Sequence, residues 1–319
     1  MRDSLAVVSE AKNGTVSIYE EIVDALNAIN GSHPGFRAVH AKGTVCVGTF
    51  TATPEAGSLS RAAHFQGEPV KTTVRFSNAS GNPNTSDANP IAGRGMAVKF
   101  HLPDGEATDI ASVPLPVFMV RDAEDFLAFT KARTPDPETG QPDQEKVMAF
   151  LADHPETANA LQLGLPKLAP TSSYATSGYN ALHAFCLVDA DGGKQWGRYE
   201  WHPTEGEQYL SDEQREAAGS DYLQDELRER LASGAAGFRL EFRLAADGDS
   251  LTDPTEEWKG ERQVVALGEL TVTDVIEEPT DGPLVFDPIN LTDGIEPSDD
   301  KILAARSPAY SVSIERRMA

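Results

Sequence analysis

The sequence contains few cysteines, few basic residues for its number of acidic ones, and no long hydrophobic run. Its 319 residues include 27 lysines and arginines against 50 aspartates and glutamates, which gives a formal net charge of −23. A strongly negative chain is repelled by nucleic acid and by anionic lipid, so we expect no nucleic-acid and no membrane partner. No stretch approaches the roughly 20 apolar residues that cross a bilayer.

The two cysteines, Cys46 and Cys186, lie far apart and lack the close spacing of a metal or redox motif. One disulfide between them is an alternative, but two buried free thiols fit the pattern better. The first residues, from Met1 to Ser4, include an acidic side chain and no apolar core, so no signal peptide is predicted. Both observations favour a reducing cytoplasm.

Helical patterns are few. Ser17 and Glu20 form a capping-box pattern, and apolar residues follow at helical spacing as far as Asn30. This first helix is expected to be structural. Three further helical stretches are predicted, at 144–153, 156–163 and 211–233, the last with a break near Gly219.

Strand patterns dominate the rest of the chain. They are found at 44–50, 93–100, 238–244 and 264–272, and a hairpin turn is expected at 189–193. Many strands, few helices and no visible domain boundary indicate an α+β fold, a closed antiparallel β-barrel of about eight strands with flanking helices. We treat 1–319 as one domain, with an N-terminal helix in 1–30 and the barrel and a last helix in 31–317.

The most specific pattern lies near the end of the chain. Four short motifs follow one another from Phe286: FDPIN, GIEPS, DKIL, and an arginine, Arg306, four residues before Tyr310. Helical turns are predicted from Lys301 to Arg306, and a helix sets residues four apart on one face. The fixed positive charge of Arg306 then favours the phenolate of Tyr310. A phenolate is a hard ligand that suits ferric iron.

This segment resembles the proximal haem-binding segment of haem catalases. The resemblance implies that Tyr310 is the axial ligand of a haem iron and that Arg306 is its charge partner. The alternative is a helix end whose arginine faces solvent and whose tyrosine packs in the core. Four motifs in the same order within 25 residues favour the haem interpretation.

A second match lies nearer the N-terminus, where the stretch RAVHAKG begins at Arg37. It resembles the distal motif of the same family. The resemblance implies that His40 lies above the haem with Val39 among the cofactor contacts, and that Ser77 hydrogen-bonds to His40 and fixes its ring. By the same resemblance, Arg37 and Arg75 would face the haem propionates.

One departure from the family pattern is informative. The catalase pattern has two asparagines where this chain has Val113 and Pro114. The distal amide is therefore missing, which predicts a drier pocket with one donor fewer for a peroxide. Just beyond, Phe118 and Phe126 match family positions at the haem, although the spacing of Phe126 also fits a helix core residue beside Phe129.

The resemblance runs from Arg37 to Arg317. By position, Arg317 is expected to bind the cofactor and to support the phenolate. His183 matches a family position too, and we expect it to be a structural histidine of the barrel. Full-length catalases carry a longer N-terminal arm and a further C-terminal section that this sequence lacks. The expected unit is the haem-binding core alone, as a homodimer or a monomer.

These motifs predict a haem peroxidase of the minimal catalase-related type. The resemblance implies haem b with ferric iron, a hydrogen peroxide or organic hydroperoxide substrate, and a small organic electron donor. A neutral imidazole at His40 suits the proton transfer that peroxide cleavage needs. Weak catalase activity is expected because the second peroxide loses an orienting donor at Val113.

Three alternatives remain at this point. A small true catalase would evolve dioxygen and gain nothing from added donors. An allene oxide synthase has a threonine before the distal histidine, where this chain has Val39. A non-catalytic haem-binding protein would not need a distal base, so the joint presence of His40, Ser77, Arg306 and Tyr310 argues against it.

Overall fold

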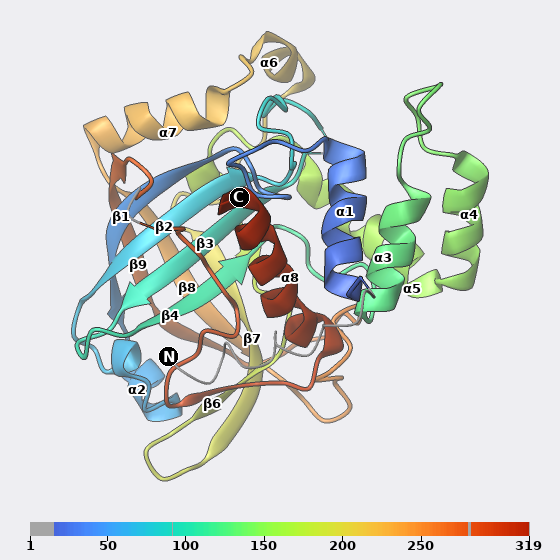
Figure 1. The fold of residues 1–319 in the computed structure, drawn as a ribbon. Coiled ribbons are helices and arrows are strands. Elements are labelled where there is room, and N and C mark those ends of the chain that lie inside the picture. Colours follow the sequence, from blue (N-terminus) through green and yellow to red (C-terminus); the bar gives the residue numbers. More distant parts are fainter. Residues whose placement is uncertain (1–15, 91, 280–281, 319) are drawn as a thin grey trace.

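A single antiparallel sheet of ten strands forms the centre of the molecule in a computed structural model that describes residues 16–90, 92–279 and 282–318. The strand order is β10-β6-β7-β8-β9-β1-β2-β3-β4, and β5 pairs with β7. The sheet curls strongly, as Figure 1 shows. The strands are β1 (Gly43–Ala52), β2 (Val70–Asn78), β3 (Arg94–His101), β4 (Ala107–Ser112), β5 (Tyr179–Asn180), β6 (Phe185–Val188), β7 (Lys194–Pro203), β8 (Ala236–Leu244), β9 (Val264–Ile276) and β10 (Ile295–Pro297).

The barrel closes through its shortest strand. Val113, directly after β4, exchanges two backbone hydrogen bonds with Asn180 of β5, at 3.0 and 2.6 Å. Because β5 also pairs with β7 at Trp201 and Glu200, the ring runs β1-β2-β3-β4-β5-β7-β8-β9 and returns to β1. The predicted closed barrel of about eight strands is therefore confirmed.

The interior of the barrel is filled by every second residue of the strands. Met96, Val98 and Phe100 of β3 are at most 1% exposed, as their alternation with polar residues predicts. Phe238 and Phe242 of β8 face the same core. Large aromatic rings pack edge to face there, for example Phe50 against Phe100 at 5.1 Å between ring centroids. The barrel is thus a packed core, and a functional site has to lie elsewhere.

The helices lie outside the barrel. In Figure 1, α1, α3, α4 and α5 gather on one side, and α8 runs across the front of the sheet beside α1. Arg316 of α8 forms an ion pair with Asp24 of α1 at 2.5 Å. The α-helices are α1 (Ile18–Asn30), α2 (Pro54–Leu59), α3 (Ala123–Ala132), α4 (Gln144–Asp153), α5 (Pro155–Gly164), α6 (Asp212–Ala217), α7 (Tyr222–Ser233) and α8 (Lys301–Met318), and short 3-10 turns lie at Ala63–Phe65, Leu165–Leu168 and Tyr174–Thr176.

Most predicted elements are confirmed, with one large difference in length. The capping box of α1, the break between α6 and α7, and the β6–β7 hairpin are present. The last helix, predicted only from Lys301 to Arg306, continues through Pro308 to Met318. A proline lacks the amide donor for a helical hydrogen bond, so the sequence favoured an earlier end.

Other predictions about the chain have different outcomes. Cys46 and Cys186 are both buried free thiols, as expected. Within the described ranges, no helix is long and apolar enough to cross a bilayer. The expected absence of a signal peptide concerns Met1 to Ser4, which lie outside the described residues.

Candidate active site

The second half of β2 is buried on both of its faces. Up to Thr73 the strand alternates between buried and more accessible residues, but from Val74 to Asn78 every residue is buried. Arg75 and Ser77 point away from the core and are nevertheless only 5% and 4% exposed. A strand that is polar on its outer face and still buried must be covered by other segments. This covered patch is where the predicted site residues meet.

His40 packs directly on this patch. Its Nδ1 lies 2.9 Å from the Oγ of Ser77, as the resemblance implied. A Cβ atom at Gly95, which pairs with Ser77 across the β2–β3 ladder, would lie 2.8 Å from the His40 ring. His40 itself has a φ of 57°, an unusual backbone conformation for a residue other than glycine. The ring is thus held by the hydrogen bond with Ser77 and packs against the backbone of Gly95, which has no side chain.

The surroundings of His40 keep its imidazole neutral. Burial lowers the pKa of His40 to about 3, and the positive charges of Arg75, Arg306 and Arg37 act in the same direction. Both effects disfavour the imidazolium. A neutral imidazole can accept a proton, which is the property required of a general base near neutral pH.

The other half of the predicted site lies on α8. Arg306 donates two hydrogen bonds to the Oη of Tyr310, 3.0 Å from Nε and 2.7 Å from Nη2. The spacing of four residues places both side chains on one face of the helix, as predicted. The side chains are partly buried, and the guanidinium concentrates positive charge at the tyrosine oxygen.

A buried aspartate directly before Lys301 fixes the start of this helix. Asp300 accepts hydrogen bonds from the amides of Ile302 and Leu303, at 2.8 and 3.2 Å, and so caps the helix. Its other oxygen lies 2.6 Å from the Nδ1 of His183. Both side chains are buried, so His183 is part of the support of α8. This placement agrees with the structural role that we expected for His183.

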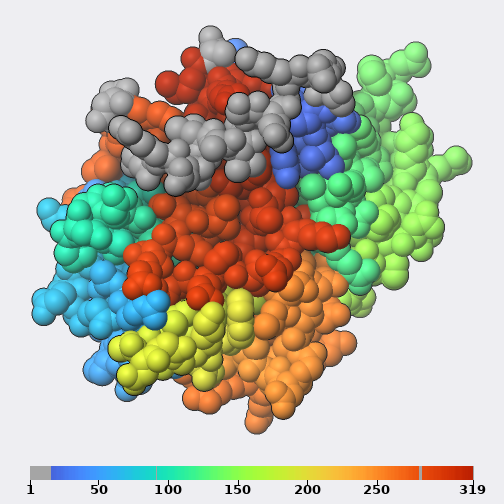
Figure 2. All heavy atoms as spheres, turned by 60° about the horizontal axis from the view of Figure 1, so that its bottom comes forward, coloured from blue at the N-terminus to red at the C-terminus, as the bar shows by residue number. Residues whose placement is uncertain are grey.

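A second anchor ties the FDPIN motif to the barrel. Asp287 accepts a hydrogen bond from Ser307 of α8 at 2.5 Å. Asp109 of β4 accepts from the backbone of Asp287 and from the side chain of Asn290, at 3.0 and 3.1 Å, and forms an ion pair with Lys99 at 2.6 Å. The orange-red segment that includes this motif crosses the face shown in Figure 2. The motif thus positions α8 against β3 and β4.

The two halves of the predicted site are brought together. The backbone amide of Ala38 donates to the Oγ of Ser313 on α8 at 3.3 Å. The charge of Arg306 is also close enough to lower the pKa of His40. Segments near the two ends of the chain therefore lie next to each other over the outer face of β2.

Three arginines form a cluster at this site with a single carboxylate. Arg37 and Glu278 form an ion pair with a shortest distance of 2.6 Å, and Arg75 lies 3.7 Å from the same carboxylate. Burial and the charge of Arg37 lower the pKa of Arg317. Arg317 is thus close enough to Arg37 and Glu278 for their charges to act on it, and its expected support of the phenolate stays a prediction. No hydrogen bond from Arg317 is found in the described part of the chain.

The remaining predicted contacts lie on the side of α3. Phe118 and Phe126 stack at 5.9 Å between ring centroids, and both pack against a small apolar cluster that includes Phe129 and Ile302. Phe126 is only partly buried, so it has both the core contacts of a helix residue and an accessible side. Val39 is partly buried next to His40.

Val113, where the resemblance puts one of the family's asparagines, directly follows the last residue of β4. Ser112 pairs with Met96, so the next residue of the chain continues the row formed by Ser77 and Gly95. Its backbone groups are used by Asn180. The Asn180 amide donates to the carbonyl oxygens of Pro114 and Leu115, at 3.2 and 3.1 Å, so it also fixes this segment. An apolar side chain in this row offers no hydrogen bond to a substrate.

A family model described as Catalase matches residues 6–319 of this chain. The chain belongs to the catalase family. Two similar proteins are each called a catalase-related peroxidase. The one from Mycolicibacterium paratuberculosis is 40% identical over 93% of this chain and 94% of its own length, and the one from Synechococcus elongatus is 36% identical over 98% and 92%. A catalase from Pseudomonas aeruginosa is 30% identical over 94% of this chain and 60% of its own length.

Solved structures of catalases share the fold. A fungal catalase superposes with a TM-score of 0.80 over 93% of this chain and 62% of its own, at 22% identity. A bacterial catalase gives a TM-score of 0.79 over 98% of this chain and 63% of its own, at 21% identity. This family member therefore shares the fold of these catalases over 62% and 63% of their own length, and the family implies a haem group.

The residues of the site are suited to a haem. Three arginines and one glutamate leave two positive charges unmatched, and the Nε of Arg75 is buried without a hydrogen-bond partner among the described residues. The two propionates of a haem would supply two negative charges there. The oxygen of Tyr310 bonds only to Arg306 within the described ranges, which leaves it able to bind a metal.

Sequence reasoning missed Glu278 and the bond between Asp300 and His183. Glu278 follows Glu277 at the end of a strand, where acidic residues are normally solvated, so no sequence signal marked it. Asp300 belongs to the DKIL motif, but its partner lies 117 residues away. Only the fold brings such residues together.

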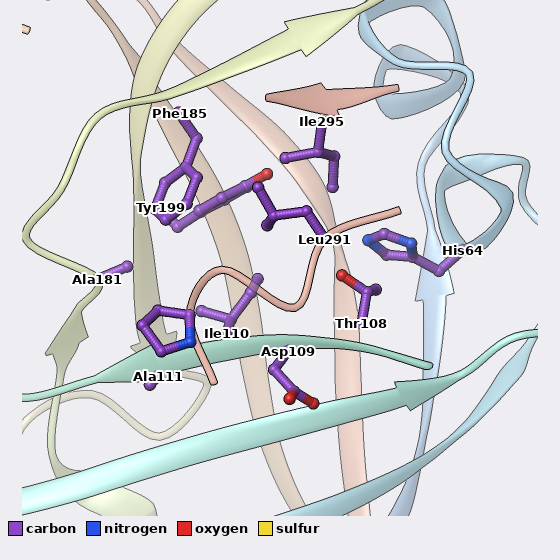
Figure 3. A pocket seen from close by; sticks show the side chains of 11 residues that line it. His64, Thr108, Asp109, Ile110, Ala111, Ala181, Phe185, Tyr199, Leu291 and Ile295 are labelled. Carbon is purple, nitrogen blue, oxygen red and sulfur yellow. The ribbon is translucent and has the colours of Figure 1, made fainter. Parts of the chain in front are cut away.

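A further buried histidine lies away from this site. His64 is 1% exposed, burial lowers its pKa to about 3, and its Nδ1 has no hydrogen-bond partner among the described residues. It faces a cavity of about 10 Å³ between β4 and the segment that includes Leu291 and Ile295, shown in Figure 3. That volume is about the size of one water molecule. The cavity is too small for a substrate.

We predict that Gly95→Ala displaces the ring of His40. The added methyl group would lie 2.8 Å from the ring and 3.0 Å from the Oγ of Ser77. A displacement of about 1 Å in a catalytic group can cost on the order of 10²-fold in rate. The rate of reaction with hydrogen peroxide, measured by stopped-flow absorption, should fall by about that factor. Gly219→Ala, where nothing lies within 4 Å of the new Cβ, is the matched control. Equal rates in the two variants would contradict the prediction.

Proposed function

We propose that this chain is a haem-dependent peroxidase that reduces hydrogen peroxide or organic hydroperoxides with a small organic electron donor. The observation that carries the proposal is the joint placement of His40 with Ser77 and of Tyr310 with Arg306 over one patch of the barrel. The names of the two similar relatives, which this chain covers over 94% and 92% of their length, support the same activity.

In this proposal the cofactor is haem b with ferric iron. Tyr310 would bind the iron, and Arg306 would stabilise the negative charge on its oxygen. Arg37, Arg75 and Arg317 would bind the propionates, and the chain's own contacts at Val39, Phe118 and Phe126 would be apolar. When bound, the haem would supply the redox chemistry that cleaves the O–O bond, and two electrons from the donor would restore its ferric state.

His40 moves the proton that this cleavage requires. Its neutral imidazole accepts a proton from one oxygen of the peroxide and delivers it to the other, which leaves as water or alcohol. The hydrogen bond with Ser77 fixes the orientation of the ring during both transfers. The low pKa of His40 keeps the imidazole in the proton-accepting form at neutral pH.

The distal pocket favours a peroxidase over an efficient catalase. Dioxygen evolution needs a second peroxide, oriented by a donor in addition to His40. Val113 lies in the row of Ser77 and Gly95 and has no such donor. External donors, which need only reach the edge of the haem, are less affected. A cytoplasmic location and a homodimer stay predictions.

His40→Ala tests the proposal directly. The variant should still bind haem, because Tyr310 and the three arginines that would hold the haem are unchanged. Its reaction with hydrogen peroxide should slow by about 10²–10⁴-fold, the usual contribution of a positioned acid–base group. Haem binding is measured by absorption and turnover by oxidation of an added phenolic donor. His33→Ala, a half-buried histidine that bonds the carbonyl oxygen of Asn30, is the control. Unchanged reactivity in His40→Ala would favour a haem-binding protein without turnover.

The low pKa of His40 predicts a flat pH profile. A free imidazole has a pKa of about 6.5 and would lose its base function below that pH. In this chain the pKa is lowered to about 3, so the base form persists as the pH falls. The second-order rate constant for hydrogen peroxide should therefore stay constant from about pH 5 to pH 8. A midpoint near pH 6.5 in stopped-flow measurements would show that the imidazole titrates normally.

An amide side chain in the row of Ser77, Gly95 and Val113 should shift the activity toward dioxygen evolution. Val113→Asn adds a side-chain donor next to His40, and one hydrogen bond contributes about 0.5–1.5 kcal/mol. Dioxygen evolution, followed with an oxygen electrode, should rise about 3–10-fold. Donor oxidation should change less. Val113→Thr, which is close to valine in shape, is the control for size, and no rise in dioxygen with Val113→Asn would remove Val113 from the explanation.

A further inference from the structure

The pairing of the strands explains why Glu278 lies at the edge of the predicted propionate site. Ile276, the last residue of β9, pairs with Val45 of β1, and Val45 pairs with Arg75 of β2. The three residues form one row across the sheet. Glu278, two residues further along the chain, therefore emerges beside the outer face that carries Arg75.

Its carboxylate is the shared counter-ion of the arginine cluster. It accepts two hydrogen bonds from Arg37, at 2.6 and 3.3 Å, and lies 3.7 Å from the Nε of Arg75. Arg37 is held further by the carbonyl oxygen of Leu284 at 2.8 Å. Burial alone would raise the pKa of Glu278, but the hydrogen bond from Arg37 and the charges of Arg37, Arg75 and Arg317 hold it below its usual range. Glu278 is thus ionised and half-buried among three cations.

The arginines need such a counter-ion. Arg75 is 5% exposed, and its pKa is lowered to about 10 by burial and by the charge of Arg37. Like charges gathered in a partly dry site repel one another and destabilise the fold unless an anion compensates them. Among the described residues, Glu278 is the carboxylate that contacts both Arg37 and Arg75.

We propose that Glu278 acts as an internal carboxylate that stabilises the arginine cluster before haem binds and opposes the haem propionates afterwards. This inference rests on the proposed function, since it concerns the same arginines. A propionate that approaches Arg37 and Arg75 meets the negative charge of Glu278, which is already in place. Glu278 therefore sets the haem affinity below the value that three free arginines would give.

The proposal predicts two effects of opposite direction in Glu278→Gln. The haem-free chain loses the counter-ion of its arginines, so its thermal unfolding midpoint should fall. Haem should bind more tightly, because a negative charge beside the propionates is removed. One partly exposed charge pair corresponds to a change in dissociation constant of up to about fivefold. A residue with a merely structural role would lower the stability and the haem affinity together.

The experiment compares Glu278→Gln with Glu277→Gln, which removes an equal charge from the exposed neighbouring residue. Haem-free protein is titrated with ferric haem and, separately, with its dimethyl ester, whose propionates carry no charge. Both titrations are followed by absorption, and unfolding of the haem-free chains by circular dichroism. We expect tighter binding of haem but not of the ester in Glu278→Gln, a lower unfolding midpoint, and no change in Glu277→Gln.

Equal or weaker haem binding by Glu278→Gln would overturn the inference, and so would an equal gain with the ester. If Glu278→Gln does not fold without haem, Glu278→Asp replaces it. The shorter side chain places the carboxylate farther from the arginines, so both effects should keep their directions and be smaller. A wild-type chain that takes up no haem would instead overturn the proposed function itself.

Discussion

The site depends on the burial of polar groups on the outer face of β2. Arg75 and Ser77 lie under other segments, and a polar group out of water is costly unless it is paired. Their partners come from distant parts of the chain: His40 for Ser77, and the carbonyl oxygen of Ala41 with the carboxylate of Glu278 for Arg75. The site therefore forms only when three segments are in place together: the residues before β1, the residues after β9, and α8. The site is a product of the whole fold.

This patch is positively charged, although the molecule as a whole is negative. The chain has a net charge of −23, yet four arginines, Arg37, Arg75, Arg306 and Arg317, surround the site. Their charges act with burial to keep His40 neutral and, in the proposed function, would attract the carboxylates of a haem. The same charges would destabilise the cofactor-free fold without Glu278. In our proposal, one cluster would thus link haem affinity, the protonation of His40 and stability.

The row of Ser77, Gly95 and Val113 carries the difference from the family pattern on which the proposed activity rests. Ser77, Gly95 and Val113 follow one another across β2, β3 and the end of β4. The first residue orients the base, the second leaves room for its ring, and the third is apolar. Asn180 supplies an amide nearby, but it donates to Pro114 and Leu115 and so fixes the backbone. In the proposed function, a peroxide would therefore meet His40 as its base and no second donor in this row.

The sequence by itself determined those features that depend only on residues close together along the chain. The spacing of Arg306 and Tyr310, the alternation in 96–100 and the capping box at Ser17 each depend on neighbours along the chain, and each is confirmed. It did not reveal that α8 continues through Pro308, because tertiary packing outweighs the loss of one helical hydrogen bond. Closure of the barrel through Asn180, the pairing of His183 with Asp300 and the place of Glu278 were decided by the tertiary structure. Those contacts join residues 67 to 241 positions apart, and only burial in a common core brings such residues within hydrogen-bonding distance.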